Sequence, residues 1–138
     1  MRRTLALLVA ALGVFGLTAP VLAHHGFETE YDRNKAVKLT GVVTMIAWTF
    51  PHMRVYVDVK EANGTVTHWN LEMGTPNDYT RQGWRKGDVL PGEEVVFEAY
   101  GGHVVESRGQ LRSITKVGET KPIFSGEAPG FKPPALLP

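Results

Sequence analysis

The chain has 138 residues, with 15 lysines and arginines against 14 acidic side chains, and it contains no cysteine. This length suits one domain with a single modest core, and the balanced charge argues against a nucleic-acid-binding protein, which needs clustered cations. Without cysteine, the chain cannot form disulfides, thiolate metal sites or cysteine nucleophiles.

The first 23 residues have the order of a secretory signal peptide. Two arginines open the segment, residues 5–17 form an apolar run, and small residues precede a cleavage position after Ala23. The unbroken apolar run is shorter than the ~20 residues that cross a bilayer, and no basic stop-transfer cluster follows it. We therefore expect an exported chain, periplasmic or secreted, that begins at His24 and has no membrane span after cleavage.

Three strands are predicted after a polar lead segment. Residues 37–48 are rich in β-branched side chains around Gly41, which favours a long, bent strand. Residues 53–60 alternate apolar and polar side chains, as in a half-buried strand. Asn63-Gly64 is a two-residue hairpin signal, and residues 65–73 supply the returning strand.

A short helix and two further strands complete the pattern. Thr75 is a good N-cap, Pro76 suits the first helical position, and Gly83 can end a helix of about two turns. Residues 94–100 alternate as a fourth strand, and residues 110–117 form a weaker fifth one.

The order of these elements predicts an all-β domain with one short helix. Five strands with a helix between the third and fourth are typical of the partly open Greek-key barrel of the oligonucleotide/oligosaccharide-binding (OB) type. A small open β-sandwich is the alternative. The domain is expected to span residues 24–117, and the Pro/Gly-rich tail at 118–138 is expected to be mostly disordered.

Several short motifs form a recognisable set, among them His24-His25-Gly26-Phe27, Trp48-Thr49-Phe50-Pro51-His52 and Pro91-Gly92-Glu93-Glu94-Val95. Across residues 24–117 the chain resembles an uncharacterised family of small exported proteobacterial proteins, a domain of unknown function. Members of that family typically start His-His-Ser-Phe and contain Trp-Thr-Asn-Pro-His, so this chain differs at Gly26 and Phe50. The resemblance implies export and a single β-rich domain, and it implies no mechanism.

The histidines suggest a metal site. A terminal His24 could bind through its amine and its ring, and the ring of His25 would complete the nitrogen geometry that copper favours. His52 and His103 fall in the loops between strands one and two and between strands four and five, which flank one ligand face in an OB-type barrel. The hypothesis is a copper site built from His24, His25 and His52, with His103 as a weaker fourth ligand.

Other interpretations of these residues stay open. The two terminal histidines could be a flexible exposed end, and His52 could simply pack beside Pro51. Three methionines, Met45, Met53 and Met73, could indicate Cu(I) binding, but Met53 and Met73 are in phase with the apolar side chains of their strands and are expected to lie in the core.

The alternative function is a non-enzymatic envelope module that binds a small organic ligand or a protein partner. It would use the face of strands two and three, with Tyr56, His68 and Trp48 as candidate ligand-face residues. No nucleophile elbow or phosphate-binding glycine loop is present in the sequence, so we do not expect an enzyme. A copper-dependent oxidase is a third hypothesis.

Overall fold

The computed structural model describes residues 26–126, apart from the side chain of Glu28. Two short helices and six strands follow one another in the order α2 (Phe27–Glu30), β1 (Tyr31–Ala47), β2 (Arg54–Lys60), β3 (Val66–Glu72), α3 (Pro76–Arg81), β4 (Glu94–Gly102), β5 (Arg108–Lys116) and β6 (Phe124–Ser125). No helix within this described range is long and apolar enough to cross a membrane. The predicted signal peptide, residues 1–23, lies outside it.

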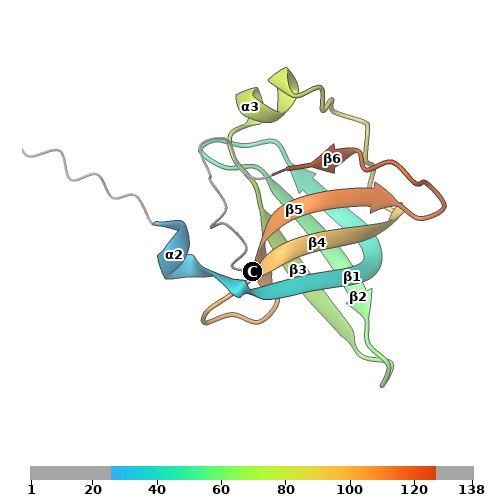
Figure 1. Ribbon diagram of the computed structural model, residues 1–138. Coiled ribbons are helices and arrows are strands. Elements are labelled where there is room, and N and C mark those ends of the chain that lie inside the picture. Colours follow the sequence, from blue (N-terminus) through green and yellow to red (C-terminus); the bar gives the residue numbers. More distant parts are fainter. Residues whose placement is uncertain (1–25, 127–138) are drawn as a thin grey trace, which may run out of the picture.

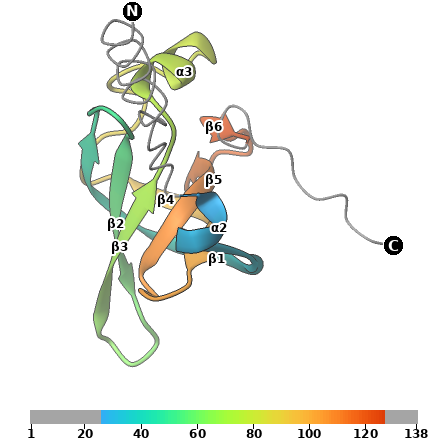
Figure 2. The ribbon, with the colours of Figure 1, turned by 90° about the vertical axis from the view of Figure 1, so that its left-hand side faces the viewer.

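The sheet closes on itself. Its strand order is β3-β2-β1-β4-β5-β6, and β3 also pairs with β5, so that β1 to β5 form a ring (Figure 1). Every pairing is antiparallel except β3 with β5, which is parallel. Helix α3 lies at one end of the ring and the β2–β3 hairpin projects at the other (Figure 2). The structure thus confirms a mostly antiparallel β domain with a short helix between the third and fourth strands.

Strand β1 is longer than predicted. It has 17 residues and starts at Tyr31, six positions before the predicted start. Its first part pairs with β4, but the register shifts between Tyr31 and Ala36, where the side chains are mostly exposed and polar. Without alternating apolar side chains, this part of the strand gave no periodic signal in the sequence.

The β2–β3 hairpin is present, but its turn is longer than the predicted two residues. Lys60 pairs with Val66, and the backbone N–H of Glu61 donates to Thr65 O at 2.8 Å. The N–H of Gly64 donates to Glu61 O at 2.9 Å, and Gly64 has a positive φ of 86°. This is the three-residue loop with a left-handed glycine, and it moves the pairing register by one residue relative to a two-residue turn.

The core fills the ring with alternate strand residues. Val55, Val57 and Leu71 are fully buried, as expected from the period-2 pattern of β2 and β3. Met53 and Met73 are buried as well, which agrees with their predicted place in the core rather than with a thioether copper site.

An aromatic cluster closes the ring at the α3 end. The ring centroids of Tyr79 and Phe124 are 4.7 Å apart, and Trp84 stacks on Phe124 at 5.8 Å. Phe124 belongs to β6, which pairs with β5 and lies inside the segment predicted to be a mostly disordered tail. The strand is only two residues long, too short for a periodic signal, and burial of Phe124 holds it to the core. Residues 127–138 lie outside the described residues.

Helix α3 begins as predicted. Thr75 is the N-cap, and its Oγ1 accepts a hydrogen bond from the Asp78 N–H at 3.3 Å. Because a short helix depends on its caps, we expect Thr75→Ala to lower the free energy of unfolding by about 1 kcal/mol, measured by urea denaturation. Thr80→Ala is the control, since the exposed Thr80 hydroxyl donates only within the helix to Pro76 O. An equal loss in the two variants would contradict the cap.

Candidate functional site

A buried carboxylate, that of Glu72, lies at the end of β3. It is in the opposite phase to the core residue Leu71, so the strand pattern alone would leave it exposed. The β2–β3 register places Arg54 directly opposite Glu72, and the parallel β3–β5 register places Arg108 opposite Asn70, one step along the same face. These strand pairings bring two guanidinium groups onto one acid.

Four side chains converge on this carboxylate. Oε2 of Glu72 accepts hydrogen bonds from Arg54 Nη2 at 2.6 Å, from the Tyr31 hydroxyl at 3.0 Å and from Arg108 Nη2 at 3.2 Å. Oε1 lies 2.6 Å from His52 Nδ1. We call these five residues the Glu72 network.

Two further polar groups extend the network. Arg54 Nη1 donates to Asn70 Oδ1 at 3.0 Å, and Arg108 Nη2 forms an ion pair with Glu30 at 2.7 Å. Glu30 ends helix α2. The two acids, Glu30 and Glu72, balance the two arginines in formal charge, as a buried ionic cluster requires.

The surroundings of Glu72 keep it ionised. Burial alone raises the pKa of its carboxyl, but the charge of Arg54, the hydrogen bond from Tyr31 and the nearby His52 and Arg108 outweigh burial and hold that pKa below its usual value. The pKa of the Tyr31 phenol is raised, first by burial and then by the negative charge of Glu72. Tyr31 therefore remains a neutral donor to the carboxylate at physiological pH.

His52 is the exposed member of the network, with 48% of its side chain accessible to solvent. An ionised carboxylate only accepts hydrogen bonds, so Nδ1 of His52 must carry the hydrogen that lies between them. In the neutral imidazole this leaves the lone pair on Nε2. A carboxylate that fixes the tautomer and the ring in this way is the usual outer partner of metal-binding histidines.

Helix α2 attaches the chain segment after His25 to the same network. The Phe27 ring lies 5.7 Å from the Tyr31 ring and 5.6 Å from the Tyr100 ring. The Arg33 guanidinium lies 4.8 Å from the centre of the Phe27 ring. The start of the described chain is thus packed beside Tyr31, whose hydroxyl contacts Glu72.

The predicted metal ligands are distributed unevenly. His24 and His25 lie outside the described residues. His52 is in the Glu72 network, and His103 is exposed, with its backbone N–H donating to Glu30 O at 3.1 Å. Within residues 26–126 no group of three or more histidine or acidic side chains is arranged to hold a metal ion.

The alternative ligand face is divided between two places. Tyr56 and His68 share the outer face of β2 and β3, where His68 Nδ1 lies 2.6 Å from Asp58 Oδ1 and the His68 side chain is 77% exposed. Trp48 instead follows β1 and packs edge-on against Trp84 at 5.9 Å. The three predicted residues therefore do not form one surface.

Sequence reasoning missed Glu72, Arg54, Arg108 and Tyr31. Arg54 and Glu72 could have been paired if the three-residue turn had been recognised, because the hairpin register then places them opposite each other. The contribution of Arg108 depends on the parallel pairing of β3 with β5, which no local pattern indicates. Tyr31 was missed because it begins an irregular part of β1.

Comparison with known proteins places the chain in a family. A model described as a family of unknown function (DUF6152) matches residues 12–111. Neither the curated proteins nor the solved structures gave a match. Since the matched region covers most of the chain, from before α2 into the first half of β5, the protein belongs to the DUF6152 family.

Proposed function

We propose that this protein is an exported, periplasmic copper-binding protein that handles the metal through a processed N-terminus. Removal of residues 1–23 would give His24 a free amine, and that amine, the His24 and His25 rings and His52 would supply the nitrogen ligands that suit copper. Its role is binding or transfer of the metal rather than catalysis.

The observation that carries the proposal is the orientation of His52. Its Nδ1 lies 2.6 Å from Glu72 Oε1, which leaves Nε2 as the nitrogen that can bind a metal, and about half of the side chain is accessible to solvent. Two arginines and a tyrosine fix that carboxylate in turn. A histidine fixed through two layers of contacts loses little freedom when it binds a metal.

The position of helix α2 gives independent support. Gly26 precedes Phe27, which packs on Tyr31, and Tyr31 contacts the carboxylate that holds His52. Covalent geometry limits the distance from the Cα atom of Gly26 to that of His24 to about 7 Å. After cleavage, the first residue would therefore be only two residues from a glycine that precedes a helix packed on the Glu72 network.

We also infer that the ring is an OB-like Greek-key barrel. The circular order β1-β2-β3-β5-β4, the parallel pairing of β3 with β5 and the helix between β3 and β4 support this inference.

Export itself is tested by intact-mass analysis of protein recovered from the periplasm. We expect a chain that begins at His24, and any other first residue would remove the amine ligand and contradict the proposal.

Copper binding is tested by calorimetric titration of Cu(II) into residues 24–138. One alanine added before His24 should weaken binding by more than about tenfold, because the amine can no longer chelate together with the His24 ring. His52→Ala should also weaken it. Copper affinity of the unmodified chain should also fall as the pH drops below ~8, because the terminal amine is then protonated.

His68→Ala is the matched control. His68 has the same Nδ1 to carboxylate distance of 2.6 Å as His52, but its partner is Asp58 on the outer face of the hairpin. We expect this variant to bind copper like the unmodified chain. Equal affinity of the extended chain and the unmodified chain, or an equal loss for His52→Ala and His68→Ala, would overturn the proposed site.

A further inference from the structure

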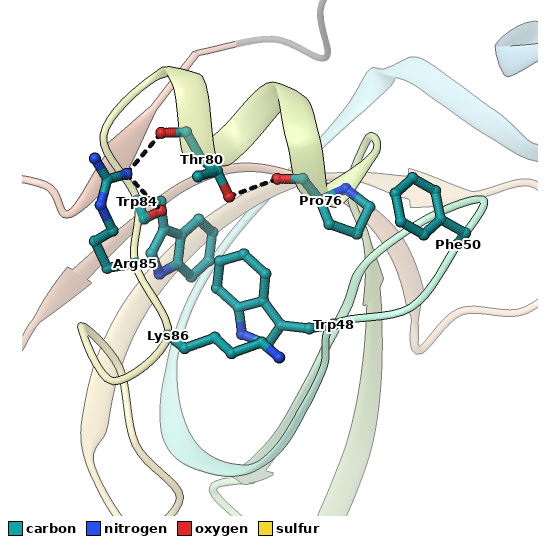
Figure 3. A pocket seen from close by; sticks show the side chains of 7 residues that line it. All are labelled: Trp48, Phe50, Pro76, Thr80, Trp84, Arg85 and Lys86. Atoms are coloured by element: carbon teal, nitrogen blue, oxygen red, sulfur yellow. Dashed lines mark hydrogen bonds between the residues drawn. The ribbon is translucent and has the colours of Figure 1, made fainter.

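A second site lies beside helix α3, away from the Glu72 network. A pocket of ≈ 390 Å³ lies between the loop that follows β1 and the segment that begins with α3. Figure 3 shows the side chains that line it. Its lining residues are Trp48, Phe50, Pro76, Thr80, Trp84, Arg85 and Lys86. The volume falls in the range of pockets that bind small organic molecules.

Four of the seven residues that line the pocket have aromatic or proline rings. Trp48 and Trp84 meet edge-on, with ring centroids 5.9 Å apart, and Pro76 and Phe50 lie on the other side in Figure 3. Phe50 is 67% exposed although it is a large apolar side chain. Folding thus leaves this ring uncovered at the mouth of the pocket, where an aromatic surface can stack on a flat ligand.

One side of the pocket is positively charged. Two of the seven lining residues, Arg85 and Lys86, are cations, and none of the seven is an acid. Arg85 Nη1 donates to Thr80 O at 2.6 Å and to Trp84 O at 3.3 Å, which fixes the guanidinium at the end of α3. The nearby Asp88 carboxylate accepts from the backbone N–H of Arg85 at 2.6 Å. Lys86 is exposed, and its side chain runs beside Trp48 in Figure 3, so its ammonium group is accessible to an anion, and Arg85 adds positive charge next to it.

We propose that this pocket binds a small aromatic anion, a carboxylate or sulfonate carried on one or two fused rings. The ring system would lie against Trp48 and Phe50, and the anionic group would face Arg85 and Lys86. This proposal does not depend on copper binding. The two sites share only the loop between β1 and β2, with Phe50 facing one and His52 belonging to the other.

The test uses two fluorescent probes with the same ring system and the full chain from residue 24. The anion is 8-anilinonaphthalene-1-sulfonate, and the neutral probe is N-phenyl-1-naphthylamine. We expect saturable binding of the anion that quenches tryptophan fluorescence, and weaker binding of the neutral probe. Lys86→Glu should weaken binding of the anion at least tenfold and leave the neutral probe unaffected, whereas Phe50→Ala should weaken binding of both.

Two matched variants control for general effects. Lys60→Glu makes the same charge change at an exposed position at the far end of β2, and Val104→Ala truncates a side chain that is 91% exposed. Neither should change probe affinity. Lys86 and Phe50 are both exposed, so their variants should fold, which thermal denaturation verifies.

Three outcomes would overturn the proposal. They are equal binding of the two probes, anion affinity unchanged by Lys86→Glu, and a change of oligomeric state in Phe50→Ala without any change in probe binding. The last result would assign the exposed ring to a contact between proteins. Copper titration of the same variants should give the affinity of the unmodified chain, so failure at this pocket is distinguishable from failure at the metal site.

Discussion

Replacing Glu72 with glutamine is expected to lower the free energy of unfolding by about 3 kcal/mol. The substitution keeps the shape of the side chain but removes the charge that Arg54 and Arg108 share, leaving two guanidinium groups close together without their common acid. We place the loss at the lower end for a buried pair because these arginine side chains are 26% and 34% exposed. Urea denaturation followed by circular dichroism measures the difference.

Glu98→Gln is the matched control. Glu98 pairs with Lys38 at 3.0 Å, but both side chains are largely exposed, and such surface pairs contribute at most about 1 kcal/mol. A loss for Glu72→Gln no larger than that for Glu98→Gln would show that the Glu72 network does not stabilise the fold.

The Glu72 substitution also has an expected pH dependence. The folded pKa of this carboxyl is below its ordinary value of 4.5, so the unfolded chain binds the proton more readily than the folded one. Its stabilisation is then complete above about pH 4.5 and is lost as the pH falls towards the folded pKa. The difference between the unmodified chain and Glu72→Gln should therefore shrink on acidification.

Gly41→Val is expected to destabilise the fold by about 3 kcal/mol, at the upper end for overpacked sites. Gly41 precedes the first residue of β1 that pairs with β2, and a Cβ atom built there would be 2.5 Å from the carbonyl oxygen of Asp58 and 2.7 Å from Val57 Cγ1. The first of these contacts is with backbone, so it cannot be relieved by a change of rotamer. The two strands would have to separate.

Gly26→Ala is the control for Gly41. Gly26 has an ordinary φ of −61°, and a Cβ atom there would meet no heavy atom within 4 Å. Its substitution should change stability by less than about 0.5 kcal/mol. If Gly41→Val unfolded at the same urea concentration as the unmodified chain, the close approach of β1 and β2 would be wrong.

Most of the fold could be predicted because the sequence signals for its strands and helix each lie within a few neighbouring residues. The alternation of Val55, Val57 and Val59, the Asn63-Gly64 turn and the cap at Thr75 each determine structure over a few residues, and the structure has the corresponding strands and helix. The start of β1 and the whole of β6 were missed. The start of β1 pairs with the distant strand β4, and β6 is held by the packing of Phe124 on Tyr79 and Trp84. Neither segment has a periodic pattern of its own.

The candidate site was predicted less well for the same reason. His52 was identified because histidine is the side chain in this chain that best suits a transition metal and because it falls in a predicted loop beside the ligand face of the barrel. The alternating pattern of β3 predicts that its partner Glu72 faces solvent. Only the pairing of β3 with both β2 and β5 buries this side chain. A residue whose role is set by three strands cannot be recognised from the pattern of one.

The pairing of β3 with β5 also determines when the domain can fold. Strand β5 spans residues 108–116, so it is the last of the five ring strands in the chain and the one that joins β3 to β4. Until β5 pairs with them, the edges of β3 and β4 have free backbone groups, which can pair with other chains. Non-local closure of this kind slows folding, and a chaperone that shields the β3 edge before β5 pairs with it would protect the chain while it is most prone to aggregate.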